Sequence, residues 1–148
     1  MGIGEKGTGV GVLEGPYAEL TGKVIGAAID VQRALGPWLL EAAYEACLTH
    51  ELELRGHRVQ RQVGVDLNYR GLKVANAYRM DLMVDDVLVV ELKVVESLDA
   101  AHEAQVMSYL RFAGKPVGLL LNFASHPLVK NGIRRFVMDN HLSSASSV

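Results

Sequence analysis

The chain has 148 residues, 49% of them hydrophobic, and a formal net charge of −2. This length is sufficient for one buried core, and the slightly negative charge argues against a generic nucleic-acid coat protein, which depends on excess positive charge. The single cysteine, Cys47, excludes an internal disulfide framework and fits a reducing cytosol, so we expect a cytoplasmic protein. No apolar run is long enough to span a bilayer, and we expect no membrane partner.

Glycine-rich residues 1–16 and serine-rich residues 141–148 are expected to be flexible tails around a single domain at residues 17–140. Apolar periodicity predicts a first helix over Tyr17–Leu35, ended by Gly36 and Pro37, and a second over about Leu39–Arg55. Cys47 lies in the second helix, and we expect it at or near the core.

Three strands are predicted next, at Arg58–Tyr69, Lys73–Met83 and Val87–Val95. A helix over Leu98–Phe112 and a strand buried on both faces at Val117–Phe123 follow. The short last element, Ile133–Met138, is either an edge strand or a helix. The order α-α-β-β-β-α-β, with a crossover helix before the buried strand, predicts an α/β fold in which helices flank a mixed β-sheet.

The segment from Asp81 to Lys93 predicts a β-hairpin with charges on one face. Its apolar residues alternate with a second set that contains Asp81, Glu91 and Lys93. For the apolar residues of both strands to share a face, Asp81 must lie opposite Glu91, and residues 85–87 form the turn. A register shifted by one residue would bury the charges.

Paired carboxylates of this kind repel each other unless they share a proton or a cation. Their hard oxygen atoms favour Mg²⁺ or Mn²⁺, and Lys93 would then orient a water molecule or neutralise charge on a phosphate. The alternative is a solvated outer sheet face with a cross-strand ion pair.

Two helical stripes supply further candidates. His102, Gln105 and Tyr109 share a face of the predicted helix that follows Glu91 and Lys93. Glu41 and Tyr44 share a face of the second helix. The alternatives are ordinary core packing for the aromatic residues and a helix-dipole role for Glu41.

Two groups of basic residues are candidate phosphate contacts, although charge runs are usually solvated faces. They are Arg55, His57, Arg58, Arg61, Arg70, Lys73 and Arg79, and then Lys130, Arg134 and Arg135.

The ordered set of these motifs resembles the small bacterial GxxExxY proteins of the PD-(D/E)xK nuclease-like superfamily. The likeness covers about Leu20 to Met138 and rests on four segments: residues 35–45 (LGPWLLEAAYE), Asp81, residues 91–93 (ELK) and residues 102–109 (HEAQVMSY). It implies a restriction-endonuclease-like core in which Asp81, Glu91 and Lys93 are the metal and catalytic set. Glu41 would be a helical acid, and Gln105 and Tyr109 would match the superfamily's Gln-x-x-x-Tyr motif.

Two positions depart from the family pattern. The namesake glycine is Trp38 here, and a histidine common before Leu-Gly-Pro is Gln32. Trp38 would shield the mouth of the site or cap the core, and the change at residue 32 removes a possible substrate contact. Neither position alters the acids or Lys93.

We therefore expect a Mg²⁺- or Mn²⁺-dependent deoxyribonuclease. Asp81 and Glu91, joined by Glu41, would bind the metal, and Lys93, Gln105 and Tyr109 would complete the catalytic set. Contacts to nucleic acid are expected from Tyr44, His102 and Arg79. The alternative is a protein with the nuclease fold that binds nucleic acid or a protein partner without turnover.

Overall fold

The computed structural model describes residues 14–138, so the predicted tails lie almost wholly outside the described residues. The described chain forms eight elements: α1 Ala18–Leu35, α2 Glu41–Leu54, β1 Val59–Tyr69, β2 Leu72–Val84, β3 Leu88–Lys93, α3 Ala100–Ala113, β4 Val117–Asn122 and β5 Ile133–Val137. The predicted order of the first seven elements is confirmed. The undecided last segment is a strand, because it pairs antiparallel with β4.

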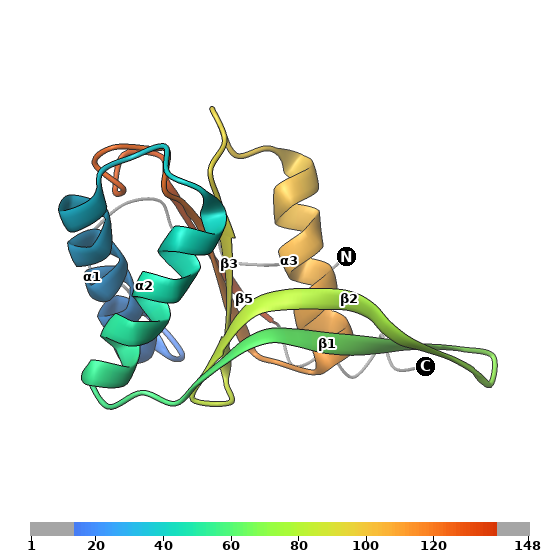
Figure 1. The fold of residues 1–148 in the computed structure, drawn as a ribbon. Helices are drawn as coiled ribbons and strands as arrows, with labels where there is room; N and C mark the ends of the chain where they lie inside the picture. The colour runs from blue at the N-terminus through green and yellow to red at the C-terminus, as the bar shows by residue number, and fades with distance from the viewer. Residues whose placement is uncertain (1–13, 139–148) are drawn as a thin grey trace.

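The five strands form one mixed sheet in the order β1-β2-β3-β4-β5. Among the strands of residues 14–138, β3 and β4 are the one parallel pair, and α3 makes the crossover between them. In Figure 1, α1 and α2 lie on one side of the sheet and α3 on the other, while the β1–β2 hairpin extends well beyond the remaining strands. The architecture is the α/β, restriction-endonuclease-like fold expected from the sequence.

Alternation along β2 and β3 divides the apolar residues between two cores. Leu82, Val90 and Leu92 pack with α1 and α2, whereas Met83 and Val89 pack with α3. The paired positions are Leu82–Val90, Met83–Val89 and Val84–Leu88, with residues 85–87 as the turn, so the predicted register is confirmed where the strands pair. This register directs the odd-numbered acids of the two strands to the α3 side.

Two local features fix α3 over the sheet. Its first turn is closed by a capping box, in which the Asp99 carboxylate accepts from the His102 amide at 3.0 Å and the His102 ring accepts from the Asp99 amide at 3.1 Å. Beneath the helix, a Cβ on Gly118 of β4 would stand 2.9 Å from a Val106 methyl group. Glycine at this position therefore permits the close approach of α3.

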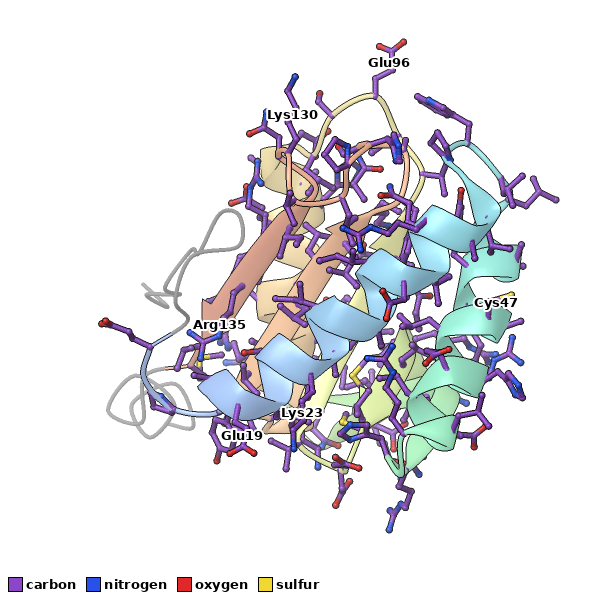
Figure 2. All side chains as sticks on the ribbon, turned by 90° about the vertical axis from the view of Figure 1, so that its left-hand side faces the viewer. Glu19, Lys23, Cys47, Glu96, Lys130 and Arg135 are labelled. Carbon is purple, nitrogen blue, oxygen red and sulfur yellow. The ribbon has the colours of Figure 1, made fainter. Side chains whose placement is uncertain are left out.

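The expectation that Cys47 lies at or near the core is wrong. Cys47 is exposed on the outer face of α2 and does not belong to the core (Figure 2). Its neighbours Leu48 and Leu52 are fully buried, so the helix turns Cys47 toward solvent. Within residues 14–138, no helix has the length and apolar character needed to cross a membrane.

Candidate active site

The site forms where β2 and β3 separate. Beyond the Leu82–Val90 pair, each strand is held by a carboxylate of the other. The Asp81 amide donates to Glu91 Oε1 at 3.0 Å, and the Leu92 amide donates to Asp81 Oδ2 at 2.9 Å. Asp81 and Glu91 therefore converge as predicted, but through bonds from side chain to backbone. One oxygen of each carboxylate, Asp81 Oδ1 and Glu91 Oε2, is free of these backbone bonds.

Burial and mutual repulsion change the acidity of this pair. Glu91 is only 3% exposed, and its burial, followed by the negative charge of Asp81, raises its pKa to about 8. Burial likewise raises the pKa of Asp81, with a further contribution from the charge of Glu45. A solvated outer sheet face is excluded at this point of the sheet, because Glu91 is almost wholly buried. The pair is able to share a proton or to bind a cation.

Lys93 lies one pleat beyond Glu91 on the same strand and points to the same side. Its Nζ stands 3.8 Å from Glu91 Oε2, and its side chain is 18% exposed. The ammonium group offsets only part of the negative charge, because the pKa of Glu91 remains raised. Lys93 is therefore positioned to contact an anion that approaches the two acids.

The N-terminus of α2 brings Glu41 into the electrostatic range of the pair. The pKa of Glu41 is raised, first by partial burial of its carboxyl group and then by the charge of Asp81, while Lys93 lowers it. Among the residues that the structure describes, no side chain caps α2, so Glu41 does not act as a capping hydrogen-bond acceptor. The predicted position of Glu41 near the acids is consistent with these interactions.

Sequence reasoning missed two residues of the site, Glu45 and Gln62. Gln62 Nε2 lies 2.5 Å from Glu45 Oε1 and 3.4 Å from Asp81 Oδ1, so it connects the two acids. Arg61 fixes the other oxygen of Glu45, with donor distances of 3.1 and 3.0 Å. Gln62 has a φ of 52°, a left-handed conformation that non-glycine residues adopt rarely and that concentrates at functional sites.

The helix α3 places Gln105 and Tyr109 over the acids. Their side chains hydrogen-bond to each other, and the pKa of Tyr109 is raised, first by burial and then by the charges of Glu91 and Asp81. Tyr109 also meets Tyr78 edge to face, with ring centroids 5.8 Å apart. The two residues predicted from the helical stripe are therefore near the acids, and Tyr109 is also part of the core.

The residues expected to contact nucleic acid lie in three different environments. Tyr44 is fully buried, and its hydroxyl donates to the Gly36 carbonyl and accepts from the Leu39 amide. His102 serves the α3 capping box. Arg79 is exposed on β2 and does not belong to the group of acids formed by Glu41, Glu45, Asp81 and Glu91, which we call the acidic cluster. Tyr44 and His102 thus have structural partners of their own.

The two departures from the family pattern also have clear surroundings. Gln32 is buried and donates to the carbonyls of Phe123 at 3.0 Å and Ser125 at 2.6 Å, so it joins α1 to the β4–β5 loop. Trp38 is 58% exposed and does not cap the core.

Ion pairs neutralise much of the two basic groups. Arg55 pairs with Asp30 and Glu51, Arg61 with Glu45, and Lys73 with Asp66. The His57 ring is hydrogen-bonded to the Asp85 carboxylate. Arg135 is buried and donates to Thr21, and Arg134 pairs with Glu103 at 3.8 Å. Neither group is a continuous cationic surface.

The donor set fits a hard divalent cation only if water or substrate supplies further ligands. Among residues 14–138, no group of three or more His, Cys, Asp or Glu side chains is arranged to hold a metal ion. Magnesium, however, commonly takes one or two protein carboxylates and keeps several water molecules. Asp81 and Glu91 meet that smaller requirement, and a bound cation, like a shared proton, would offset the burial and mutual repulsion that raise their pKa values.

Comparison with known proteins gives one family match. The model of the PD-(D/E)XK nuclease superfamily matches residues 18–136, which include every element of the described fold except the last residue of β5. Neither curated proteins nor solved structures gave a match.

Proposed function

Because the chain belongs to the PD-(D/E)XK nuclease superfamily, we propose that it hydrolyses phosphodiester bonds of DNA with the help of Mg²⁺ or Mn²⁺. Nucleases of this superfamily typically use divalent metals. The observation that supports the proposal best is the buried Asp81–Glu91 pair with Lys93 beside it. Membership of the GxxExxY group, suggested by the sequence pattern, is part of the same proposal.

Asp81 and Glu91 would hold the ion through the oxygen atoms that do not accept from backbone amides. Glu41 would complete the set directly or through water. When bound, a divalent cation lowers the pKa of water and neutralises charge on phosphate oxygens. It would also offset the burial of Glu91 and the repulsion from Asp81, which together raise the pKa of Glu91.

The remaining residues have roles that follow from their positions. The Lys93 ammonium group would stabilise the negative charge that develops on the phosphate during attack by water. Gln105 and Tyr109 would donate hydrogen bonds to the phosphate or to water, since burial keeps the Tyr109 hydroxyl protonated. Gln62 would fix the orientation of Asp81, because it donates to both Asp81 and Glu45.

A cleavage assay tests this proposal. Linear double-stranded DNA, circular DNA, single-stranded DNA and RNA are each incubated with the protein in Mg²⁺, in Mn²⁺ and in EDTA. We expect metal-dependent cleavage of DNA, none in EDTA, and loss of turnover in Lys93→Ala. A Lys23→Ala variant, which changes an exposed lysine of α1 that has no role in the proposed site, controls for the loss of one positive charge.

Absence of cleavage of every substrate with both metals would reject hydrolysis and support a protein that binds without turnover. Cleavage of RNA alone would retain the chemistry and reject DNA as the substrate. Equal activity of wild type and Lys93→Ala would remove Lys93 from the catalytic set.

A further inference from the structure

Trp38 is held in an unusual conformation at the surface. It is the only tryptophan of the chain, is 58% exposed, and has a φ of 67°. Bulky residues rarely adopt left-handed backbone angles, because their Cβ atom crowds the following carbonyl oxygen. A large aromatic ring is thus present where glycine would fit without strain. Such strain, together with exposure of the ring, indicates a role other than packing.

The loop that carries Trp38 is fixed from beneath. The buried Tyr44 hydroxyl joins the two sides of the loop, accepting from the Leu39 amide at 3.1 Å and donating to the Gly36 carbonyl. The Tyr44 ring stacks on Phe123, with centroids 4.4 Å apart and planes 13° apart. The backbone on either side of Trp38 is therefore anchored to the core, while much of the indole remains in solvent.

This loop leads directly into the acidic cluster. Helix α2 begins at Glu41, three residues after Trp38, so the two Cα atoms are at most about 11 Å apart. Glu41 is in turn close enough to Asp81 for its pKa to respond to the Asp81 charge. A substrate strand with a phosphate at the acids thus has the indole within reach of a neighbouring base.

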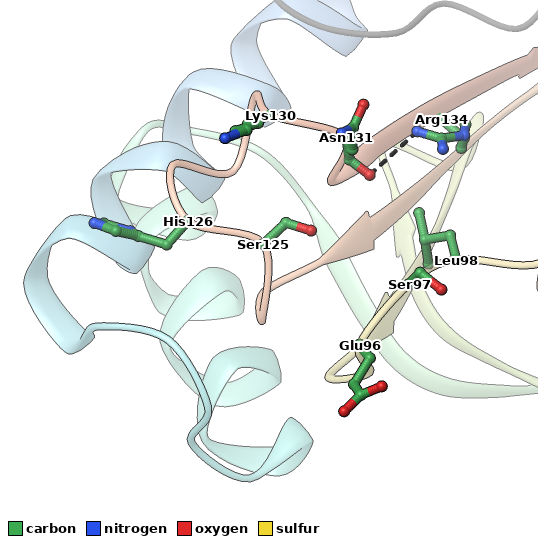
Figure 3. Close-up of a pocket in the computed structure, with 8 residues that line it drawn as sticks. All are labelled: Glu96, Ser97, Leu98, Ser125, His126, Lys130, Asn131 and Arg134. Carbon is green, nitrogen blue, oxygen red and sulfur yellow. Dashed lines mark hydrogen bonds between the residues drawn. The ribbon is translucent and has the colours of Figure 1, made fainter.

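Groups suited to phosphate lie at the same end of the molecule. The α1–α2 loop and Lys130 share this end (Figure 2), and Gln32 of α1 bonds to the β4–β5 loop. A pocket of about 430 Å³ opens there, lined in part by Ser125, His126 and Lys130 and by one acid, Glu96 (Figure 3). Lys130 makes no ion pair with any residue from 14 to 138, which leaves its charge available to a phosphate.

We propose that Trp38 is a stacking platform for an unpaired nucleobase of the substrate strand, beside the acidic cluster, with Lys130 contacting the strand's phosphates. This proposal rests on the proposed function in one respect, namely that the ligand is a nucleic acid. It assigns a preference for nucleic acid with single-stranded character, because a base inside a duplex does not present its face to a side chain.

The single tryptophan permits a direct test. Wild-type protein is titrated in EDTA, at low ionic strength, with a short oligothymidylate and with an abasic strand of equal length. Stacking quenches indole emission, so we expect quenching by oligothymidylate and little by the abasic strand. Because EDTA prevents metal-dependent cleavage, this result is independent of hydrolysis.

Variants then distinguish the contribution of base stacking to the affinity from that of phosphate contacts. By anisotropy of labelled strands, Trp38→Gly should bind oligothymidylate about 5- to 140-fold more weakly, the factor that corresponds to the loss of one stacked base. Its affinity for the abasic strand should be unchanged. Trp38→Phe should retain part of the affinity, and Lys130→Ala should weaken binding of both strands equally. Tyr69→Ala is the matched control, because Tyr69 is an aromatic residue with 61% exposure at the tip of the β1–β2 hairpin.

Equal quenching by both strands, or wild-type affinity of Trp38→Gly for oligothymidylate, would overturn the proposal. So would equal losses in Trp38→Gly and Tyr69→Ala, because binding would then depend on any exposed aromatic residue. Sedimentation that shows a dimer lost in Trp38→Gly would assign the indole to a second copy of the chain. Quenching without DNA cleavage would uphold this proposal and reject the hydrolytic function, whereas cleavage without quenching would do the reverse.

Discussion

Glu91 should make the metal-free protein less stable as pH rises. Its pKa is about 8 in the folded protein, against 4.5 for an ordinary glutamate. Between these values the folded state holds a proton that the unfolded state has released. Raising the pH therefore favours unfolding. The stabilisation is complete below about pH 4.5 and is lost as pH rises through about 8.

The full difference in pKa corresponds to about 5 kcal/mol, at 1.36 kcal/mol for each pKa unit. About 3 kcal/mol of this is lost between pH 5.5 and 8.5, the range in which an experiment avoids general acid denaturation. Glu91→Gln removes the titrating group, while its side-chain oxygen keeps the acceptor for the Asp81 amide. The variant should be more stable than wild type at pH 8.5 and should lose most of the pH dependence.

Urea unfolding followed by circular dichroism, in EDTA at both pH values, measures this difference. Glu96→Gln is the matched control, because Glu96 is exposed in the loop that follows β3 (Figure 2). If wild type and Glu91→Gln lose stability equally between the two pH values, to within about 0.5 kcal/mol, the assignment of Glu91 as a protonated buried acid is refuted.

Three further substitutions test other parts of the site. Lys93→Ala should lower the rate of DNA cleavage by about 10²- to 10³-fold while keeping most of the affinity for Mn²⁺, as followed by steady-state kinetics and calorimetry. Gln62→Gly keeps a residue suited to the left-handed backbone but removes the bond to Asp81, and should lower Mn²⁺ affinity by about 10- to 100-fold. Unchanged affinity would leave Gln62 without a positioning role. Tyr44→Phe leaves two backbone groups without their partner and should lower the free energy of unfolding by about 1–3 kcal/mol, as measured in urea.

The sequence predicts the hairpin well because two constraints act together. Burial of both apolar sets on one face excludes a slip by one residue, the short turn at residues 85–87 selects among the remaining registers, and the structure has the predicted register from Leu82–Val90 to Val84–Leu88. Alternation does not predict where the strands separate. That depends on the competition between carboxylate and carbonyl acceptors for the Asp81 and Leu92 amides, which only the three-dimensional arrangement decides.

The helical side of the site was predicted in part. Glu41 and Glu45 are four residues apart and share a face of α2, so the spacing that identified Glu41 also contained a signal for Glu45. Gln62 had no such signal, because its left-handed backbone and its bridge to Asp81 depend on the pairing of β1 with β2. The family pattern marked Trp38 as a departure from glycine, but the exposure of its ring required the structure.

The central claim is that Asp81 and Glu91 bind a divalent cation, and calorimetric titration of the protein with Mn²⁺ tests it most directly. We expect wild type to bind Mn²⁺ and Glu91→Ala to lose tight binding while circular dichroism shows that it remains folded. Mn²⁺ affinity that is unchanged in a folded Glu91→Ala protein, or absent from wild type, would contradict the account.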